Sequence, residues 1–162
     1  MLRIFRHPRK LDFGKLNAVY GQSNTQCAKK RYPCEEPGVS LLQAEQDFER
    51  YVKEEFFRVS SAFYAVWEED GAYLCALRME PYLDGYLLTS LETHPEHRRK
   101  GYATELILAV ADDVSCPVYA HIYKENVASM GTHRKCGFRQ ILDYAKLLDG
   151  TVTQRACTMC LK

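Results

Sequence analysis

Residues 91–106 read LETHPEHRRKGYATEL, and this stretch decides the interpretation of the chain. An expected strand ends here, three consecutive cations follow (Arg98, Arg99 and Lys100), and an expected helix begins at Gly101. The first turn of a helix has unpaired N–H groups, and the helix dipole is positive there. A glycine also lets the backbone approach oxygen atoms closely. The stretch therefore predicts an anion cradle suited to a pyrophosphate.

The charges alone permit a plainer interpretation, a solvated basic turn before an ordinary helix. A second pattern bears on this choice. The run from Arg98 to Ala103 resembles the Arg/Gln-x-x-Gly-x-Gly/Ala signature of the GNAT family of N-acetyltransferases. Further along, Asn126-x-x-Ser129 followed by residues 135–138 (KCGF) resembles the family's Asn helix and its closing Lys-x-Gly-Phe. The resemblance extends over most of the chain and is strongest from residue 86 to residue 138.

Hydrophobic periodicity predicts the elements around this stretch. Alternating apolar residues indicate a strand at 1–6, a meander at 62–67, 73–80 and 86–93, a strand at 118–123 and a last hairpin at 138–148 and 151–161. Helical spacing indicates helices at 11–20, 40–58, 101–114 and from Asn126 to Gly137, with Ser40 and Gln43 as a capping box. Residues 21–38 show no period and are expected to form a loop.

This order predicts an α/β (α+β) fold, a mixed and mostly antiparallel sheet of about seven strands flanked by about four helices, as in GNAT proteins. The crossover from the third meander strand through a helix to the next strand favours a parallel, right-handed pairing. With 162 residues of which 46% are hydrophobic, we expect one domain, residues 1–162.

Composition restricts the partners. The net charge is +1, which provides no bulk field for polyanions, so we expect no nucleic acid. No apolar run reaches the roughly 18 residues of a membrane span, and residues 1–10 lack a signal-peptide pattern, so we expect no membrane partner and a cytoplasmic location. Seven cysteines, an odd number, favour reduced thiols. Cys157 and Cys160 are expected on opposite faces of a strand rather than as a metal pair.

The resemblance implies acetyl-CoA as the cofactor. Main-chain N–H groups of the 98–104 loop would bind its pyrophosphate, and the strand edge at 91–93 would pair with the pantetheine amides. Asn126 and Ser129 would contact the pantetheine or the nucleotide, although a plain helix cap also explains Asn126 and a helix surface position also explains Ser129. The expected cofactor-binding residues are Leu91, Glu92, Thr93, Arg98, Arg99, Lys100, Gly101, Tyr102, Ala103, Thr104, Asn126 and Ser129.

Acetyl transfer to an amine requires a base for the ammonium proton and a proton source for the leaving thiolate. Glu92, at the end of the central strand, is the candidate base, unless it only neutralises Arg98 or Arg99. The proton-donating Tyr that is frequent in the family would fall at His133, which departs from the pattern. Its imidazolium could donate, or His133 could be a helix-surface residue, and Tyr123 could substitute.

The acceptor side is less well marked. The residues expected to line the acceptor site are Tyr32, Glu35, Glu36, Arg78, Glu80 and Tyr82, although a surface or packing role explains each of them more simply. We expect no metal site at His94, Glu96 and His97, because three cations follow them directly.

The sequence thus predicts acetyl transfer from acetyl-CoA to a primary amine of a small molecule or peptide in a ternary complex, and it allows a homodimer. The alternative is a module of the same fold that binds acyl-CoA but has lost catalysis.

Overall fold

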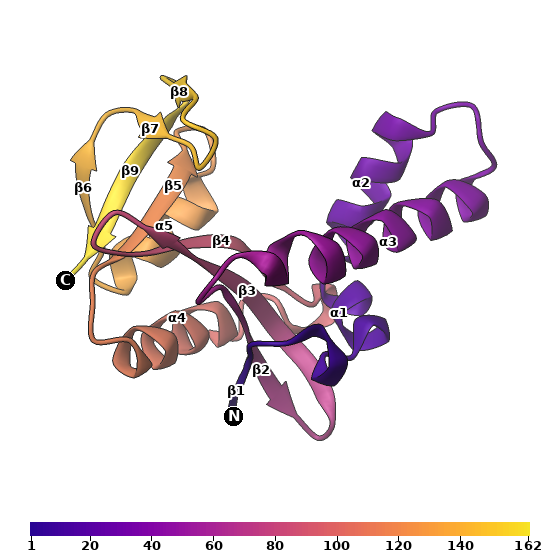
Figure 1. Ribbon diagram of the computed structural model, residues 1–162, viewed down its shortest axis with the longest axis horizontal. Coiled ribbons are helices and arrows are strands. Elements are labelled where there is room, and N and C mark those ends of the chain that lie inside the picture. The colour runs from indigo at the N-terminus through magenta and orange to yellow at the C-terminus, as the bar shows by residue number, and fades with distance from the viewer.

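The computed structural model describes residues 1–162 as a seven-stranded sheet with helices on both faces (Figure 1). The strand order is β1-β2-β3-β4-β5-β9-β6, and every pairing is antiparallel except that of β4 with β5. The strands are β1 (Leu2–Phe5), β2 (Phe63–Glu69), β3 (Ala72–Tyr82), β4 (Gly85–Thr93), β5 (Val118–Tyr123), β6 (Arg139–Leu142) and β9 (Ala156–Leu161). The predicted fold class and the parallel crossover are confirmed.

Five α-helices accompany the sheet, one more than expected. They are α1 (Phe13–Val19), α2 (Gly21–Arg31), α3 (Pro37–Glu54), α4 (Tyr102–Asp113) and α5 (Val127–Lys135). None of them combines the length and the apolar character that crossing a bilayer requires.

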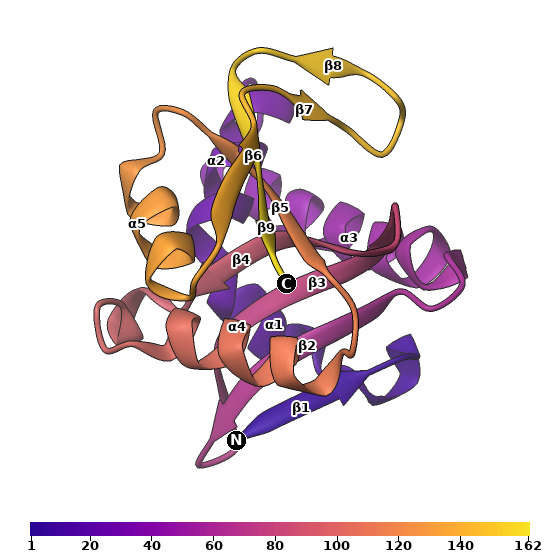
Figure 2. The ribbon, with the colours of Figure 1, turned by 90° about the vertical axis from the view of Figure 1, so that its left-hand side faces the viewer.

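The two faces of the sheet bury separate apolar cores. On one face, α4 packs Leu106, Ile107 and Val110 against β2 to β5 and β9. On the other face, α1, α3 and the turn after α3 pack against the N-terminal strands, with Val52 and Phe56 among the fully buried side chains. Figure 2 shows α4 on the near face, with α1 and α3 behind the sheet. Because apolar helix stripes cover both faces, the middle strands are almost continuously buried.

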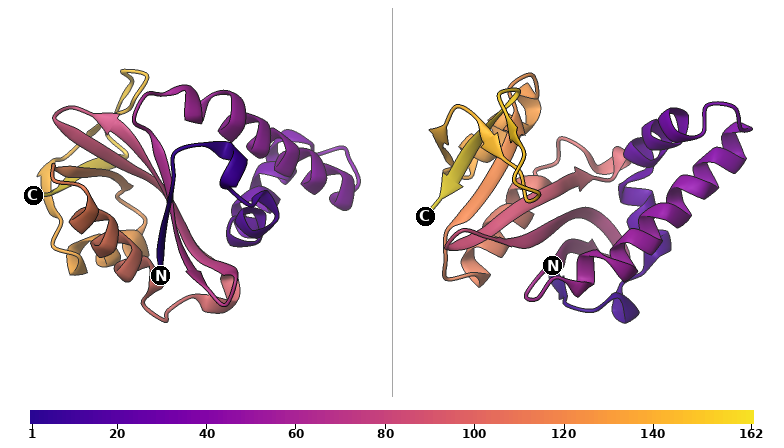
Figure 3. Two further views of the ribbon diagram at one scale, coloured as in Figure 1. Left: turned by 60° about the horizontal axis from the view of Figure 1, so that its bottom comes forward. Right: turned by 45° about the horizontal axis from the view of Figure 1, so that its top comes forward.

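The prediction of a loop at residues 21–38 is wrong, because residues 21–31 form α2. Only Asn24 and Ala28 of this helix are buried, so its inward face is small and partly polar and produces no hydrophobic period. Packing against α3 stabilises it instead, since the two helices lie side by side and extend away from the sheet (Figure 3).

The start of α3 also differs from the prediction. The helix begins at Pro37, the favoured residue type for a first helical position, and not after a capping Ser40. Ser40 lies buried inside the first turns, where its hydroxyl donates to the Pro37 carbonyl at 3.1 Å. The helix ends at Glu54, and residues Phe56–Arg58 form a 3-10 turn.

The last hairpin is present but interrupted. Strands β6 and β9 pair antiparallel as expected, and between them β7 (Ala145–Lys146) and β8 (Val152–Thr153) form a second small sheet around Gly150. On β9, Cys157 faces the α4 core and Cys160 packs with Leu87 and Tyr119 on the opposite face. All seven cysteines are free thiols, as expected.

Gly85, the first residue of β4, provides a test of this packing. A Cβ added there would lie 1.9 Å from the backbone oxygen of Pro117, the atom that accepts the Tyr86 N–H at 3.0 Å. We expect Gly85→Ala to lower the free energy of unfolding by about 3 kcal/mol, because backbone must move to relieve the clash. Chemical denaturation measures this change.

Gly131 in α5 is the matched control, since a Cβ there has nothing within 4 Å. Gly131→Ala should be neutral or stabilise by up to about 1 kcal/mol through helix propensity. Equal stability changes for the two variants would contradict this account of β4.

Candidate active site

The central feature is the separation of β4 from β5. Their parallel pairing covers only Tyr86 with Val118, Leu87 with Tyr119 and Leu88 with Ala120. Beyond these pairs both strands continue, β4 to Thr93 and β5 to Tyr123, without pairing to each other. The edge of β4 that faces β5 is therefore open over residues 89–93 and can receive an extended ligand as an added strand.

A β-bulge lies on β4 at the same level. The pairing of β3 with β4 passes from Ala76–Glu92 to Arg78–Thr89, so Ser90 and Leu91 together oppose one residue. Ser90 adopts the left-handed φ of 50°. Two side chains hold it there: the Tyr20 hydroxyl donates to its carbonyl at 2.7 Å, and Arg78 Nη2 donates to its hydroxyl. The main chain of β4 is thus reoriented where β4 and β5 separate.

A groove of about 820 Å³ runs from this opening to the start of α4. The loop before α4 is unusual in backbone conformation, since Arg99 and Gly101 have φ of 61° and 95°. The carbonyl of Gly101 accepts the Glu105 N–H, which starts the helix and leaves the first-turn N–H groups free. This geometry fits a diphosphate, because amides, helix dipole and cations converge on one surface.

The groove contains all the predicted cofactor residues except Lys100. It also contains residues that the sequence analysis missed, which are Gln22, His97, Ala128, Thr132 and Lys135. Thr132 and Lys135 follow Ser129 at intervals of three on α5, so helical spacing could have identified them. Gln22 could not be found in this way because it belongs to α2.

Asn126 is a helix cap and also lines the groove, so the cap is confirmed and a contact with the cofactor stays a prediction. Its Oδ1 accepts the Ser129 N–H at 3.0 Å, which starts α5. Ser129 lines the groove as well.

Glu92 is half-buried at the end of β4 and lines the groove. Its carboxylate accepts a hydrogen bond from the Ser23 hydroxyl of α2. Burial raises the pKa of Glu92 above its usual value, and the Ser23 bond and the charge of Arg98 oppose part of that rise. Glu92 forms no ion pair with Arg98 or Arg99, although the charge of Arg98 acts on its carboxylate.

The two predicted proton donors lie outside the groove. His133 is 2% exposed, packs on the Phe138 ring at 5.0 Å, and has Nδ1 2.9 Å from the Ser129 carbonyl. A carbonyl only accepts, so that nitrogen bears the proton, and Nε2 has no partner. Burial lowers the pKa of His133, so the imidazolium expected from the sequence is disfavoured. Tyr123 is 58% exposed and borders a different cavity.

This second cavity, about 420 Å³, lies on the sheet face that carries α3. It is lined by Tyr51, Arg78, Glu80, Leu87, Thr89, His121, Tyr123, Leu147, Leu148, Asp149, Thr153 and Ala156. Strand β4 therefore contributes to both sites, with Leu87 and Thr89 in the cavity and residues 91–93 in the groove.

Of the predicted substrate residues, Arg78 and Glu80 line this cavity, and the others do not. Tyr32 ends α2 and donates to Asp47 on the helical pair. Tyr82 packs its ring on Tyr119 and His121 and donates to the Lys146 carbonyl at 3.0 Å, so it joins the sheet to β7. Glu35 and Glu36, in the turn between α2 and α3, are exposed and line neither site.

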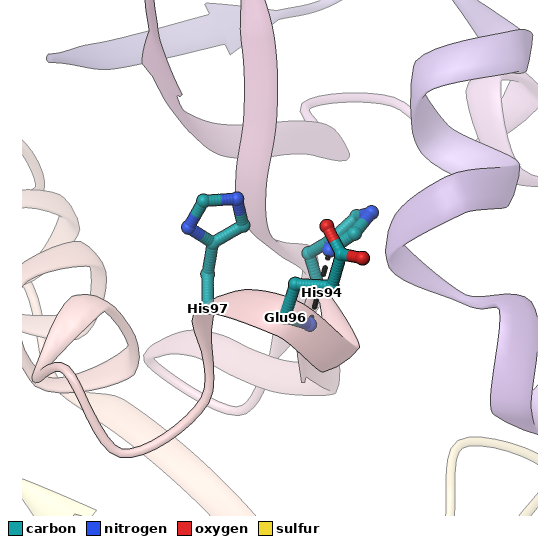
Figure 4. Close-up of side chains that lie close together, drawn as sticks. All are labelled: His94, Glu96 and His97. Carbon is teal, nitrogen blue, oxygen red and sulfur yellow. Dashed lines mark hydrogen bonds between the residues drawn. The ribbon is translucent and has the colours of Figure 1, made fainter.

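His94, Glu96 and His97 lie close together on the turn after β4 (Figure 4). Their ligand atoms lie within 4.8 Å of one another, and His94 Nδ1 already accepts the Glu96 N–H at 3.3 Å. The three cations that follow this group oppose a metal ion there, and the expectation of no metal site stays a prediction.

The sheet order, the separated strands and the glycine loop at the start of α4 together form a mixed α/β fold with an anion-binding groove beside an open strand edge. The model of the acetyltransferase (GNAT) family matches residues 27–138, more than half of the chain. The chain belongs to this family. No curated protein sequence matches it.

Solved structures show the same fold. The PaiA N-acetyltransferase of Thermoplasma acidophilum, in complex with coenzyme A, is 13% identical with a TM-score of 0.65, covering 100% of this chain and 99% of that one. The ribosomal-protein-S18-alanine N-acetyltransferase of Escherichia coli is 18% identical with a TM-score of 0.56, covering 99% and 93%. A spermidine N-acetyltransferase SpeG chimera from Vibrio cholerae and hSSAT is 19% identical with a TM-score of 0.61, covering 99% and 94%.

The backbone of the loop before α4 yields a binding prediction. Gly101 has a φ of 95°, and a side chain there costs about 1–2 kcal/mol in the left-handed region. We expect Gly101→Ala to weaken coenzyme A binding about five- to thirtyfold, because the loop must leave its anion-binding conformation. Isothermal titration calorimetry measures the dissociation constant.

Gly71→Ala is the control, since Gly71 has a φ of 76° in the turn between β2 and β3 and does not line the groove. If both variants bind coenzyme A equally well, the loop is not the binding element.

Proposed function

We propose that this protein transfers an acetyl group from acetyl-CoA to a primary amine of a small molecule or peptide, by direct attack in a ternary complex. The observation that carries the proposal is that β4 lines two sites at once, the groove and the cavity. A donor held in the groove and an acceptor held in the cavity would meet where β4 separates from β5.

The groove residues fit acetyl-CoA. When bound, it supplies an acetyl group activated as a thioester. The loop amides around Arg99 and Gly101 hold the diphosphate, and the open edge of β4 over residues 89–93 pairs with the amides of the pantetheine arm. The proposed stabiliser of negative charge on the carbonyl oxygen is the main chain of β4 near the bulge at Ser90, where the regular ladder with β3 is interrupted.

Glu92 is proposed as the general base. Its carboxylate lines the groove, forms no ion pair, and has a pKa raised by burial toward the range useful for accepting a proton. Glu92 removes the ammonium proton of the acceptor, directly or through water, before attack.

Direct transfer fits the cysteines better than a covalent relay. The Cys136 thiol is buried, bonds to the Thr104 carbonyl at 3.9 Å, and has a pKa raised by burial. Burial also raises the pKa of Cys75 to about 12. Neither thiol lines the groove or the cavity, so neither is placed as a nucleophile.

A coupled thiol-release assay across an amine library, with acetyl-CoA as donor, tests the activity itself. Release of coenzyme A that depends on an acceptor, with acetylated amine detected by mass spectrometry, is the expected result. Tight coenzyme A binding without turnover of any acceptor would instead identify a non-catalytic acyl-CoA-binding module.

The pH dependence tests the base. The Ser23 hydrogen bond stabilises ionised Glu92 and lowers its pKa, so its loss raises that pKa. We expect Ser23→Ala to move the acid limb of the kcat/KM profile to higher pH, and Glu92→Gln to lower kcat by about 100-fold or more.

Thr25→Ala on the same helix is the control, because Thr25 donates only to the Gly21 carbonyl. Its profile should match that of the wild type. If Ser23→Ala does not shift the acid limb, Glu92 is not the general base.

For the leaving thiolate, the proposed donor is Tyr123, which is 58% exposed on β5 and borders the cavity where β4 and β5 have separated, next to the groove rather than in it. His133 is proposed to position α5. We expect Tyr123→Phe to lower kcat about tenfold or more with KM for acetyl-CoA unchanged, since general acid catalysis is lost.

His133→Phe should leave the alkaline limb of the rate profile unchanged, because the Nδ1–H of His133 donates to the Ser129 carbonyl and is not available to the thiolate. An alkaline limb altered by His133→Phe, together with a Tyr123→Phe variant that keeps full activity, would reverse the assignment.

A further inference from the structure

The cavity is lined by a cation, Arg78, that forms no ion pair. Arg78 is stacked against the rings of Tyr51 and Phe56, with its Cζ 5.2 Å and 5.6 Å from their centroids. Its one hydrogen bond runs from Nη2 to the Ser90 hydroxyl, it forms no ion pair, and its buried Nε has no partner. Arginine remains charged, and buried charges are normally paired.

The same cavity is lined by a carboxylate, Glu80, that also forms no ion pair. Glu80 is 8% exposed, accepts the Thr89 hydroxyl at 2.9 Å and forms no ion pair, including with Arg78. An ionised carboxylate has about four acceptor positions, so most of its hydrogen-bonding capacity is unused.

The two unpaired charges have a fixed spacing. Arg78 and Glu80 are two residues apart on β3, so they project from the same face of the sheet about 6.6 Å apart along the strand. A small molecule with an ammonium group and a carboxylate a few bonds apart can reach both. A simple amine would leave Arg78 without an anion, and a simple carboxylic acid would leave Glu80 without a cation.

We propose that the cavity binds a zwitterionic acceptor, with its carboxylate on Arg78 and its ammonium group on Glu80. This inference deepens the proposed function by naming its acceptor class: a free amino acid or a peptide that carries a nearby carboxylate. His121 faces the same space with an Nε2 that has no partner, and it provides a third polar contact. The cavity volume of about 420 Å³ suits a ligand of amino-acid size.

Matched acceptor pairs test the proposal. Each pair shares an amine and differs only in the carboxylate: lysine with cadaverine, and phenylalanine with phenethylamine. The dipeptide amides Ser-Glu and Ser-Gln extend the comparison to peptides. If the member with the carboxylate is preferred only among the free amino acid and amine pairs, the acceptor is a free amino acid. We expect kcat/KM to be at least about tenfold higher for the member with the carboxylate, as a charge-assisted Arg–carboxylate contact predicts.

The variants use the ratio within a pair as the readout, because the ratio is insensitive to a general loss of activity. Arg78→Met should reduce the ratio to near one, and Arg78→Lys should retain part of it. Glu80→Gln, which can still accept the Thr89 hydroxyl, should weaken both members of a pair equally. Arg139→Met, at an exposed position on β6, is the control and should keep the wild-type ratio.

Calorimetric binding of the same pairs to the protein loaded with coenzyme A separates this inference from the proposed function. Selective binding of the carboxylate-bearing members without turnover would reject the acetyl transfer and support the zwitterion site. A ratio near one in the wild type, a ratio that Arg78→Met leaves unchanged, or no binding and no turnover of any zwitterion would overturn the inference.

Discussion

The site depends on β4 losing its regular pairing on both edges at one level. On one edge the parallel ladder with β5 stops at Leu88, and on the other the ladder with β3 is broken by the bulge at Ser90. A central strand normally has all its main-chain groups paired. Here the unpaired groups lie where a ligand can use them, and the buried strands on both sides keep the opening in place.

Two residues that precede Ser90 in the sequence maintain its conformation. Tyr20, from the end of α1, bonds its carbonyl, and Arg78, from β3, bonds its hydroxyl. A non-glycine residue with positive φ costs free energy, and such residues persist where their surroundings determine them. Arg78 therefore connects the bulge to the cavity, since the same guanidinium holds Ser90 and lines the acceptor side.

The electrostatics of the two sites differ in kind. The groove gathers main-chain amides, a helix N-terminus and Arg98 and Arg99, which suits a ligand of high negative charge. The cavity instead holds single charges of each sign, stacked aromatic rings and a neutral imidazole, because burial lowers the pKa of His121. Glu92, between α2 and the loop after β4, is buried enough to hold its proton more tightly than an exposed carboxylate does.

The sequence alone was sufficient for the features that local interactions determine: the order of the seven main strands and of four of the five helices, the meander, the Gly101 loop and the Asn126 cap, which depend on residues close together in the chain. It also predicted the parallel pairing of β4 with β5, because the handedness of the crossover allows little else. Only the tertiary structure decided the rest. Residues 21–31 become helical by packing on α3 and bring Ser23 to Glu92. The position of His133 in the interior, rather than facing the groove, and the unpaired state of Arg78 and Glu80 depend on contacts between segments far apart in the chain, which no local pattern records.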